Sequence, residues 1–344
     1  MRAVLKWTGR LLLLSLATGC GLMLYWANGQ NRELDAGESY QAAAIAPGQI
    51  ITVNGRRLHV LVKGDLRADP TGAPLVLLHG FSASGHTTWL PWAEQLADRR
   101  SLVLVDMLNF GYSERITTPD DDLTHQGQAA LVNGLVEALG LQRFDLVGWS
   151  MGGAIATQYT LDYPAKVRAI AFVAGHIYGF DRFNPFKMLG DLPLGIGRAL
   201  SWNSAGGSPN GFVARTCQET GQQCNWLEPL LIEDTIDGLR AISATPQRTR
   251  LPDDIPLIDK PVLVIAGELD NIVPLADNEK LAEVLDAELF VAAGAGHWPA
   301  EQEPERVATH MLEFFAANAE VAAASVRNRK SPGVSSRHEL TGEY

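Results

Sequence analysis

The stretch GWSMGG at residues 148–153 decides how the rest of the sequence is interpreted. It follows the apolar run Phe144–Val147, which is typical of a buried strand, and it leads into Met151–Asp162, which has helical spacing. A chain that changes from strand to helix within one residue needs a tight, strained turn, and its glycines let neighbouring backbone approach closely. The pattern G-x-S-x-G in this setting predicts that the hydroxyl of Ser150 is held out above the strand end, beside the positive N-terminus of a helix.

A serine hydroxyl is a weak nucleophile near neutral pH, so Ser150 needs a base, and the base needs a carboxylate that orients it. His297 is the predicted base, because its loop directly follows the last apolar strand run and would deliver it to the carboxyl edge of a parallel sheet. Asp270, in the loop after the preceding strand run, is the predicted carboxylate, with Glu268 as the alternative. The order Ser, Asp, His along the chain supports this assignment.

Such chemistry also needs hydrogen-bond donors for the negative charge that develops on a substrate oxygen. The turn His79-Gly80-Phe81 ends a predicted strand, so its backbone N–H groups can face the nucleophile. The expected donors are the amides of Phe81 and Met151. We interpret His79 itself as a residue that packs and hydrogen-bonds this turn.

Eight short runs are typical of strands, and most lead into stretches with helical spacing. Continuous Val, Leu and Ile runs that alternate with amphipathic helices indicate an α/β fold, in which a mostly parallel sheet is flanked by helices. The pair Asn54-Gly55 predicts a hairpin between the first two runs, because both central positions of its turn favour positive φ. The predicted strands are Gln49–Val53, Arg56–Val62, Pro74–Leu78, Ser101–Val105, Phe144–Val147, Arg168–Val173, Pro261–Ala266 and Ala287–Val291.

One segment interrupts this alternation. Between the sixth and seventh predicted strands, residues 176–258 contain no convincing strand–helix unit and are broken up by Gly and Pro. We interpret them as a helical cap, or lid, inserted into a domain that spans residues 49–318. Residues 319–344 are Ala-rich and then polar and basic, a composition that predicts a disordered tail.

The N-terminus differs from the rest of the chain. Arg2, Lys6 and Arg10 precede the apolar run Leu11–Trp26, and with its flanks this run is about 20 residues long, enough to cross a bilayer. The basic residues predict that the N-terminus lies on the cytoplasmic side. The sequence therefore predicts a transmembrane helix.

We expect residues 1–30 to be a retained signal anchor, followed by a linker over residues 31–48. Two alternatives stay open, namely a cleaved signal peptide and a lipidated Cys20. All three place the catalytic domain outside the cytoplasm, on the periplasmic or extracellular side of the membrane.

Charge and cysteine content limit the classes of partner and cofactor. The chain has 28 Lys and Arg against 39 Asp and Glu, a net charge of −11, which argues against binding nucleic acid.

In an oxidising compartment Cys217 and Cys224 can close into a disulfide, and two free thiols are the alternative. No His lies near them, so we expect no zinc site, and the sequence indicates no cofactor.

Five motifs together resemble those of the α/β-hydrolase family, and they stand in that family's order. The resemblance spans residues 49–317 and implies a Ser150–His297–Asp270 triad with a lid after the sixth strand. Similar haloalkane dehalogenases and epoxide hydrolases carry Asp at the nucleophile position, so Ser150 argues against both. The second motif departs from the usual D-x-x-G-x-G-x-S, because Asn109 replaces its first glycine. The motifs are HGF (79–81), DMLNFGYS (106–113), GWSMGG (148–153), GELD (267–270) and GH (296–297).

The resemblance and the residues together predict a serine hydrolase that acts on carboxylic esters, like esterases and lipases, through an acyl-enzyme, with a small-molecule acyl or ester substrate as its partner. Hydrolysis of carbon–carbon bonds, lactone opening and perhydrolysis are alternatives that use the same triad. A carbon–carbon hydrolase would need cations for a substrate carboxylate, for which Arg182, Arg198 and Arg215 are candidates. An alternative of another class is a non-catalytic, membrane-anchored binding protein that retains the fold.

Overall fold

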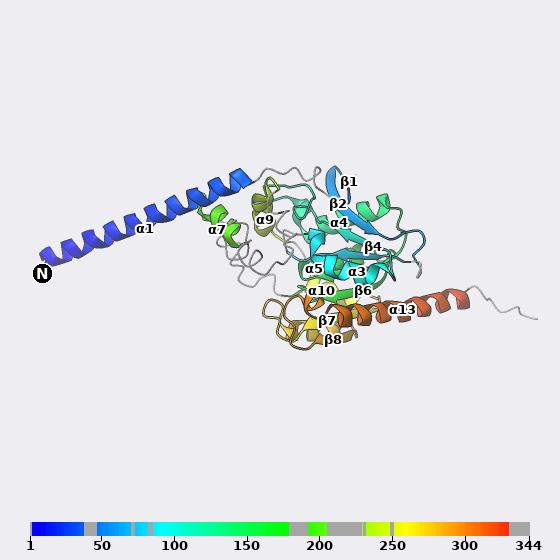
Figure 1. Ribbon diagram of the computed structural model, residues 1–344. Helices are drawn as coiled ribbons and strands as arrows, with labels where there is room; N and C mark the ends of the chain where they lie inside the picture. The colour runs from blue at the N-terminus through cyan, green and yellow to red at the C-terminus, as the bar shows by residue number, and fades with distance from the viewer. Residues whose placement is uncertain are drawn as a thin grey trace, which may run out of the picture.

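The computed structural model of the protein describes residues 2–37, 47–69, 73–81, 85–178, 192–204, 229, 232–247 and 251–329. Within this part of the chain, the strands form an eight-stranded sheet in the order β1-β2-β4-β3-β5-β6-β7-β8 (Figure 1). β1 and β2 pair antiparallel, as do β2 and β4, and all the other neighbours are parallel. The predicted mostly parallel sheet is thus confirmed. The strands are β1 (Gln49–Val53), β2 (Arg56–Lys63), β3 (Leu75–Leu78), β4 (Leu102–Val105), β5 (Phe144–Trp149), β6 (Val167–Val173), β7 (Val262–Gly267) and β8 (Glu288–Ala292).

Helices cover both faces of this sheet, and the strand sequences explain why. In β3, Val76 and Leu78 belong to the core that α4 and α5 cover, whereas Leu75 and Leu77 belong to the core that α3 and α13 cover. Because side chains alternate along a strand, a strand that is apolar at every position is stable only between two such layers. The helices outside the cap are α1 (Arg2–Gly37), η1 (Gly85–Trp89), α3 (Leu90–Ala97), η2 (Asp121–Leu123), α4 (His125–Ala138), α5 (Met151–Asp162), α11 (Leu275–Val284), α12 (Pro299–Gln302) and α13 (Pro304–Arg329).

The predicted hairpin joins β1 to β2. Asn54 and Gly55 have φ angles of 51° and 81°, the left-handed backbone that a two-residue turn of this kind requires. The hairpin forms the antiparallel edge of the sheet, at the opposite end of the strand order from β8.

The segment between β6 and β7, called the cap below, holds the short helices α7 (Ile196–Ser204), α9 (Thr235–Ala244), α10 (Leu251–Asp254) and η4 (Ile255–Leu257). In Figure 1, α7 and α9 lie beside the end of α1, and α7 contacts both helices. Cys217 and Cys224, the predicted disulfide pair, lie outside the described residues.

The structure contradicts the predicted membrane anchor. In the described part of the chain, no helix is both long enough and apolar enough to cross a membrane. The membrane-anchored, extracytoplasmic location that rested on this anchor is wrong on the same ground.

The last turns of α1 instead contact the cap. Leu34 is fully buried, the side chain of Asn31 donates to the carbonyl of Gly195 at 3.0 Å, and Asp35 pairs with Arg198 of α7 at 2.8 Å. α1 therefore continues past residue 30 into the predicted linker. At the other end of the chain, α13 continues to Arg329, into the segment for which the sequence predicts a tail.

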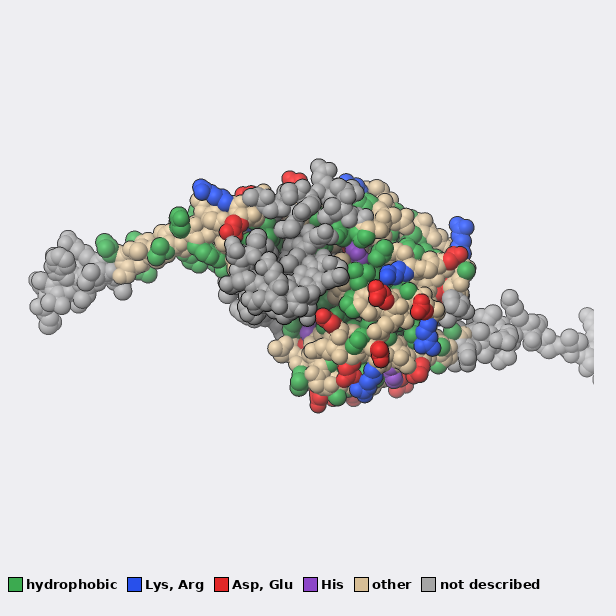
Figure 2. Space-filling view, viewed as in Figure 1, with side chains coloured by type: hydrophobic (Ala, Val, Ile, Leu, Met, Phe, Trp, Pro, Cys, Tyr) green, Lys and Arg blue, Asp and Glu red, His purple; other side chains and the backbone are tan. Residues whose placement is uncertain are grey.

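Figure 2 shows acidic and basic side chains mixed over the visible face of the sheet-and-helix part of the molecule. Among the described residues on this face, Lys and Arg do not gather into a basic patch.

Candidate active site

Ser150 lies at the turn between β5 and α5 and has a strained backbone. Its φ is 51° and its ψ is −118°, a combination that a non-glycine residue adopts only where the surroundings enforce it. The close packing of the turn, which its glycines permit, imposes this conformation: a Cβ on Gly148 would come within 2.4 Å of the Gly152 carbonyl oxygen, and one on Gly152 within 2.3 Å of the Leu78 oxygen. The strand, the turn and the helix can pack this closely only without those side chains, as the sequence predicts.

The three predicted triad side chains meet at the carboxyl edge of the sheet. Nε2 of His297 lies 3.0 Å from Oγ of Ser150, and Nδ1 of His297 lies 2.8 Å from Oδ2 of Asp270. The three residues come from the ends of β5, β7 and β8. The contacts form a continuous chain from hydroxyl to imidazole to carboxylate, which is the arrangement that activates a serine.

Tertiary structure distinguishes Asp270 from its alternative, Glu268. Oδ1 of Asp270 accepts the amides of Ile272 and Val273 at 2.8 and 2.9 Å, which leaves Oδ2 facing His297. Burial alone would raise the pKa of Asp270, but the hydrogen bonds from His297, Val273 and Ile272 hold it below its ordinary value. Glu268 is exposed, and its carboxylate accepts the amide of Gly294 at 2.7 Å. Asp270 is therefore the carboxylate of this site that contacts the imidazole.

Comparison with known proteins identifies the family. The model described as "Alpha/beta hydrolase family" matches residues 75–310, which include the whole site. The chain belongs to the α/β-hydrolase family. The hydrolase is 31% identical, over 70% of its length and 86% of the relative's, to a 2-hydroxy-6-oxononadienedioate/2-hydroxy-6-oxononatrienedioate hydrolase of Paraburkholderia phymatum.

Other relatives act on different substrates. The hydrolase is 29% identical, over 75% of its length and 96% of the relative's, to a pimeloyl-[acyl-carrier protein] methyl ester esterase of Stenotrophomonas maltophilia. The crystal structure of the enol-lactonase from Burkholderia xenovorans LB400 superimposes with a TM-score of 0.63 and 21% sequence identity, and the match covers 78% of this chain and all of that one. The structural likeness shows the fold, and the relatives together show a hydrolase without defining its substrate.

The turn after β3 lies directly against the nucleophile. A Cβ on Gly80 would lie 3.0 Å from Cβ of Ser150 and 2.8 Å from the ring of Trp149. Phe81 follows in this turn, and Met151 opens α5, where the first amides have no acceptor within the helix. Both predicted oxyanion donors thus belong to segments that touch Ser150.

His79 of the hydrolase stabilises this turn, as the sequence suggested. It is fully buried, its Nδ1 donates to the Gly80 carbonyl at 2.7 Å, and its Nε2 accepts the amide of Met107 at 3.1 Å. Burial lowers the pKa of His79 to about 4, so the neutral ring that these two contacts require is the stable form near neutral pH.

Trp149 is a supporting residue that sequence reasoning did not identify. Its indole Nε1 donates to the backbone carbonyl of His297 at 2.9 Å, and its ring packs 4.3 Å from that of Trp298. The residue before the nucleophile therefore holds the loop that carries the base. The motif marks this position only as variable, so the sequence carries no signal for the contact.

Replacing Trp149 with phenylalanine should lower kcat about tenfold with little change in KM, because a smaller aromatic ring remains while one hydrogen bond that positions His297 is lost. Steady-state kinetics on a short p-nitrophenyl ester would measure both constants. Trp89→Phe is the matched control: Trp89 is buried, its ring meets that of Trp298 edge-on, and its Nε1 has no hydrogen-bond partner in the described structure. Equal kcat values for the two variants would contradict a positioning role for Trp149.

In the described part of the hydrolase, His59, His86 and Asp106 are the only cluster of side chains that could hold a metal ion. Nδ1 of His59 and Nδ1 of His86 lie 2.7 and 2.9 Å from the Asp106 carboxylate, which also accepts the amides of His86 and Tyr112. Burial would raise the pKa of Asp106, but the two histidines keep it well below its ordinary value. A Cβ on Gly111 would lie 2.1 Å from this carboxylate, so the site is closely packed. These contacts fit a buried hydrogen-bonding centre, and we assign no metal to it.

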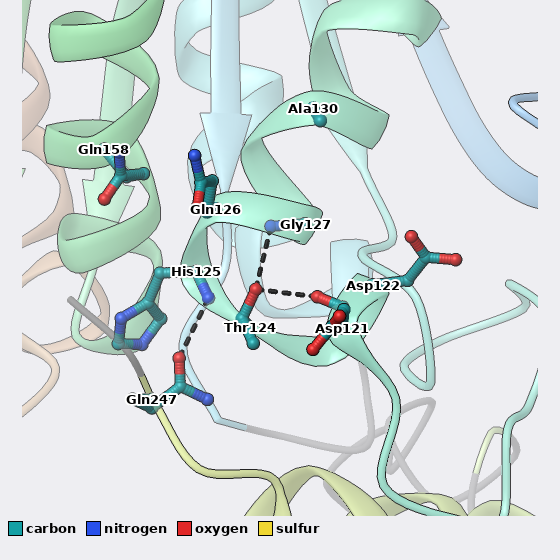
Figure 3. A pocket seen from close by; sticks show the side chains of 9 residues that line it. All are labelled: Asp121, Asp122, Thr124, His125, Gln126, Gly127, Ala130, Gln158 and Gln247. Carbon is teal, nitrogen blue, oxygen red and sulfur yellow. Dashed lines mark hydrogen bonds between the residues drawn. The ribbon is translucent and has the colours of Figure 1, made fainter.

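A hollow of about 290 Å³ lies at the start of α4, away from the triad. Figure 3 shows the side chain of Gln247, from the segment after α9, pointing toward His125, whose amide it accepts at 2.9 Å. Thr124 caps α4 by accepting the amide of Gly127 at 3.0 Å. The hollow therefore marks a junction between the cap and the main domain. Its lining residues are Asp121, Asp122, Thr124, His125, Gln126, Gly127, Ala130, Gln158 and Gln247.

Proposed function

We propose that the hydrolase cleaves carboxylic esters through an acyl-enzyme intermediate. Oγ of Ser150 attacks the carbonyl carbon while Nε2 of His297 takes the hydroxyl proton, and Asp270 stabilises the imidazolium. The amides of Phe81 and Met151 donate to the oxyanion. His297 then gives its proton to the leaving alcohol, and a water molecule attacks the acyl-enzyme in the same way to release the acid.

The observation that carries this proposal is the unbroken series of contacts from Ser150 through His297 to Asp270, at 3.0 and 2.8 Å. A base at hydrogen-bond distance from the nucleophile is the requirement for general-base catalysis. The strained backbone of Ser150 supports the same role, because such strain is retained mainly at functional sites.

Carbon–carbon bond hydrolysis is a second candidate, which the relative from Paraburkholderia phymatum supports. A substrate with a free carboxylate would need a cation to bind it. Arg198 is already held between Asp35 at 2.8 Å and Asp237 at 2.9 Å, and Arg182 and Arg215 lie outside the described residues. Because Arg198 already pairs with these two carboxylates, it does not support binding of a substrate carboxylate.

A substrate panel tests the proposal. Purified full-length protein would be assayed with p-nitrophenyl esters from acetate to palmitate, beside lactones and diketo acids, and with kcat/KM measured for each. We expect the highest kcat/KM among the esters. A higher value for a diketo acid would refute the ester proposal and support carbon–carbon hydrolysis.

Covalent labelling separates an enzyme from an inert binding protein of the same fold. A fluorophosphonate reacts with an activated serine and leaves an unactivated one unmodified. We expect labelling of Ser150 in the native protein and its loss after heat denaturation. An unlabelled native protein would favour the non-catalytic alternative.

A further inference from the structure

The loop after β4 carries Asn109 at the position where the family pattern has glycine. Its φ of 73° is one that glycine adopts freely and that asparagine tolerates better than most residues. The side chain is fully buried: Nδ2 donates to the carbonyls of Ile116 at 2.8 Å and Gly238 at 2.9 Å, and Oδ1 accepts the amide of Ile116 at 2.5 Å. Gly238 belongs to α9, so Asn109 bonds the main domain to the cap.

Arg115, at the end of the same loop, makes a second bond to α9. Its Nε donates to Oγ1 of Thr235, in the first turn of α9, at 3.0 Å. The rest of the guanidinium donates to backbone carbonyls of the loop, among them Phe110 at 3.1 Å and Gly111 at 2.5 Å. Because the guanidinium is planar and held at several points, it fixes both the loop and the helix that it joins.

α9 lies in close contact with this loop. A Cβ on Gly238 would lie 3.2 Å from Cγ of Asn109 and 3.5 Å from Cδ of Arg115. Ile236 and Leu239 of α9 are buried in the same apolar core as Met151, which follows the nucleophile. The polar bonds and the apolar contact together set the position of α9 relative to the site.

The other side of the loop touches the turn that carries the proposed oxyanion donor. The ring of Phe110 packs 5.0 Å from that of His79 and meets the ring of Phe81 edge-on at 5.6 Å. Phe81 is partly exposed, with 38% of its surface accessible. The loop thus lies between α9 and the turn of His79 and Phe81, which packs against Ser150.

We propose that Asn109 and Arg115 are positioning residues that hold α9 as a wall of the acyl-binding space, and thereby set the length of acyl chain that the enzyme accepts. This inference rests on the proposed ester hydrolysis. Both residues act through α9 and the loop and touch neither the triad nor its reacting atoms.

Two variants of Asn109 test the proposal in the full-length protein. Asn109→Gly keeps a residue that accepts the φ of 73° but removes the bonds to Gly238 and Ile116. Asn109→Asp keeps the side-chain shape but places an oxygen where Nδ2 donates to Gly238. The control is Asn133→Ala, which removes hydrogen bonds to Glu137 and Tyr159 on helices of the main domain.

We expect both Asn109 variants, but not the control, to raise KM for p-nitrophenyl octanoate about fivefold relative to acetate, with kcat changed less. Hydrogen–deuterium exchange of the amides of α9 should become about fivefold faster in the same variants. The rate of labelling by a dodecyl fluorophosphonate, relative to that by an ethyl fluorophosphonate, should fall in the same two variants.

Exchange of α9 that is equal in wild type and both Asn109 variants would overturn the proposal. An unchanged ratio of long-chain to short-chain labelling would also overturn it, because α9 would then not limit the acyl space. If the wild-type protein labels but hydrolyses no ester, the proposed function fails, while exchange and labelling still decide the role of Asn109.

Discussion

Ser150→Ala is expected to lower kcat/KM for a p-nitrophenyl ester by about 10⁴- to 10⁶-fold, because the variant has no atom that can form the acyl-enzyme. His297 and Asp270 remain in place, but a base without its nucleophile can only activate water, which is held less well at the carbonyl carbon. Fluorophosphonate labelling should disappear in the same variant. The rate would be measured in steady state and also in a single turnover with enzyme in excess over substrate. Comparison of the two rates would reveal a trace of contaminating esterase.

Ser101→Ala provides the control for this measurement. Ser101 precedes β4 at the amino edge of the sheet, opposite the triad, and its hydroxyl donates to the Asp65 carbonyl at 2.8 Å. We expect this variant to retain wild-type kcat/KM within about twofold, as usual for a substitution away from the site. An Ser150→Ala protein that folds and keeps more than a hundredth of the wild-type rate would refute the assignment of the nucleophile.

Asp270→Asn is expected to lower kcat by about 10⁴-fold without unfolding the protein. The amide oxygen can still accept the amides of Ile272 and Val273, so the loop is retained. Its NH₂ group, however, faces Nδ1 of His297 and requires that nitrogen to be an acceptor. The imidazole proton then sits on Nε2, toward Ser150, and the ring cannot take the hydroxyl proton.

Glu268→Gln tests whether the neighbouring carboxylate matters instead. Glu268 is exposed and contacts Gly294, so we expect kcat within about threefold of wild type. Circular dichroism would verify that both variants are folded. A larger loss of kcat for Glu268→Gln than for Asp270→Asn would assign the orienting role to Glu268.

Much of the fold could be predicted because its signals are local. A strand buried on both faces is apolar at every position, and the turn at Ser150 excludes side chains at its glycines, so short windows of sequence carry both features. For the N-terminal helix, by contrast, the local sequence led to a wrong prediction. Its apolar composition predicted a membrane span, but no helix in the described residues is long and apolar enough to cross a membrane, and Leu34 near the end of α1 is buried in the core that α4 and α5 cover.

The sequence by itself determined the parallel sheet, the turn that presents Ser150, and three residues in an order that suits a triad. Tertiary structure alone decided that Asp270 and not Glu268 faces the imidazole, that Trp149 holds the loop of His297, and that Asn109 bonds α9. These contacts join residues as much as 148 positions apart. Their partners are mostly backbone atoms, which every residue carries, so no pattern of side chains along the chain can reveal them.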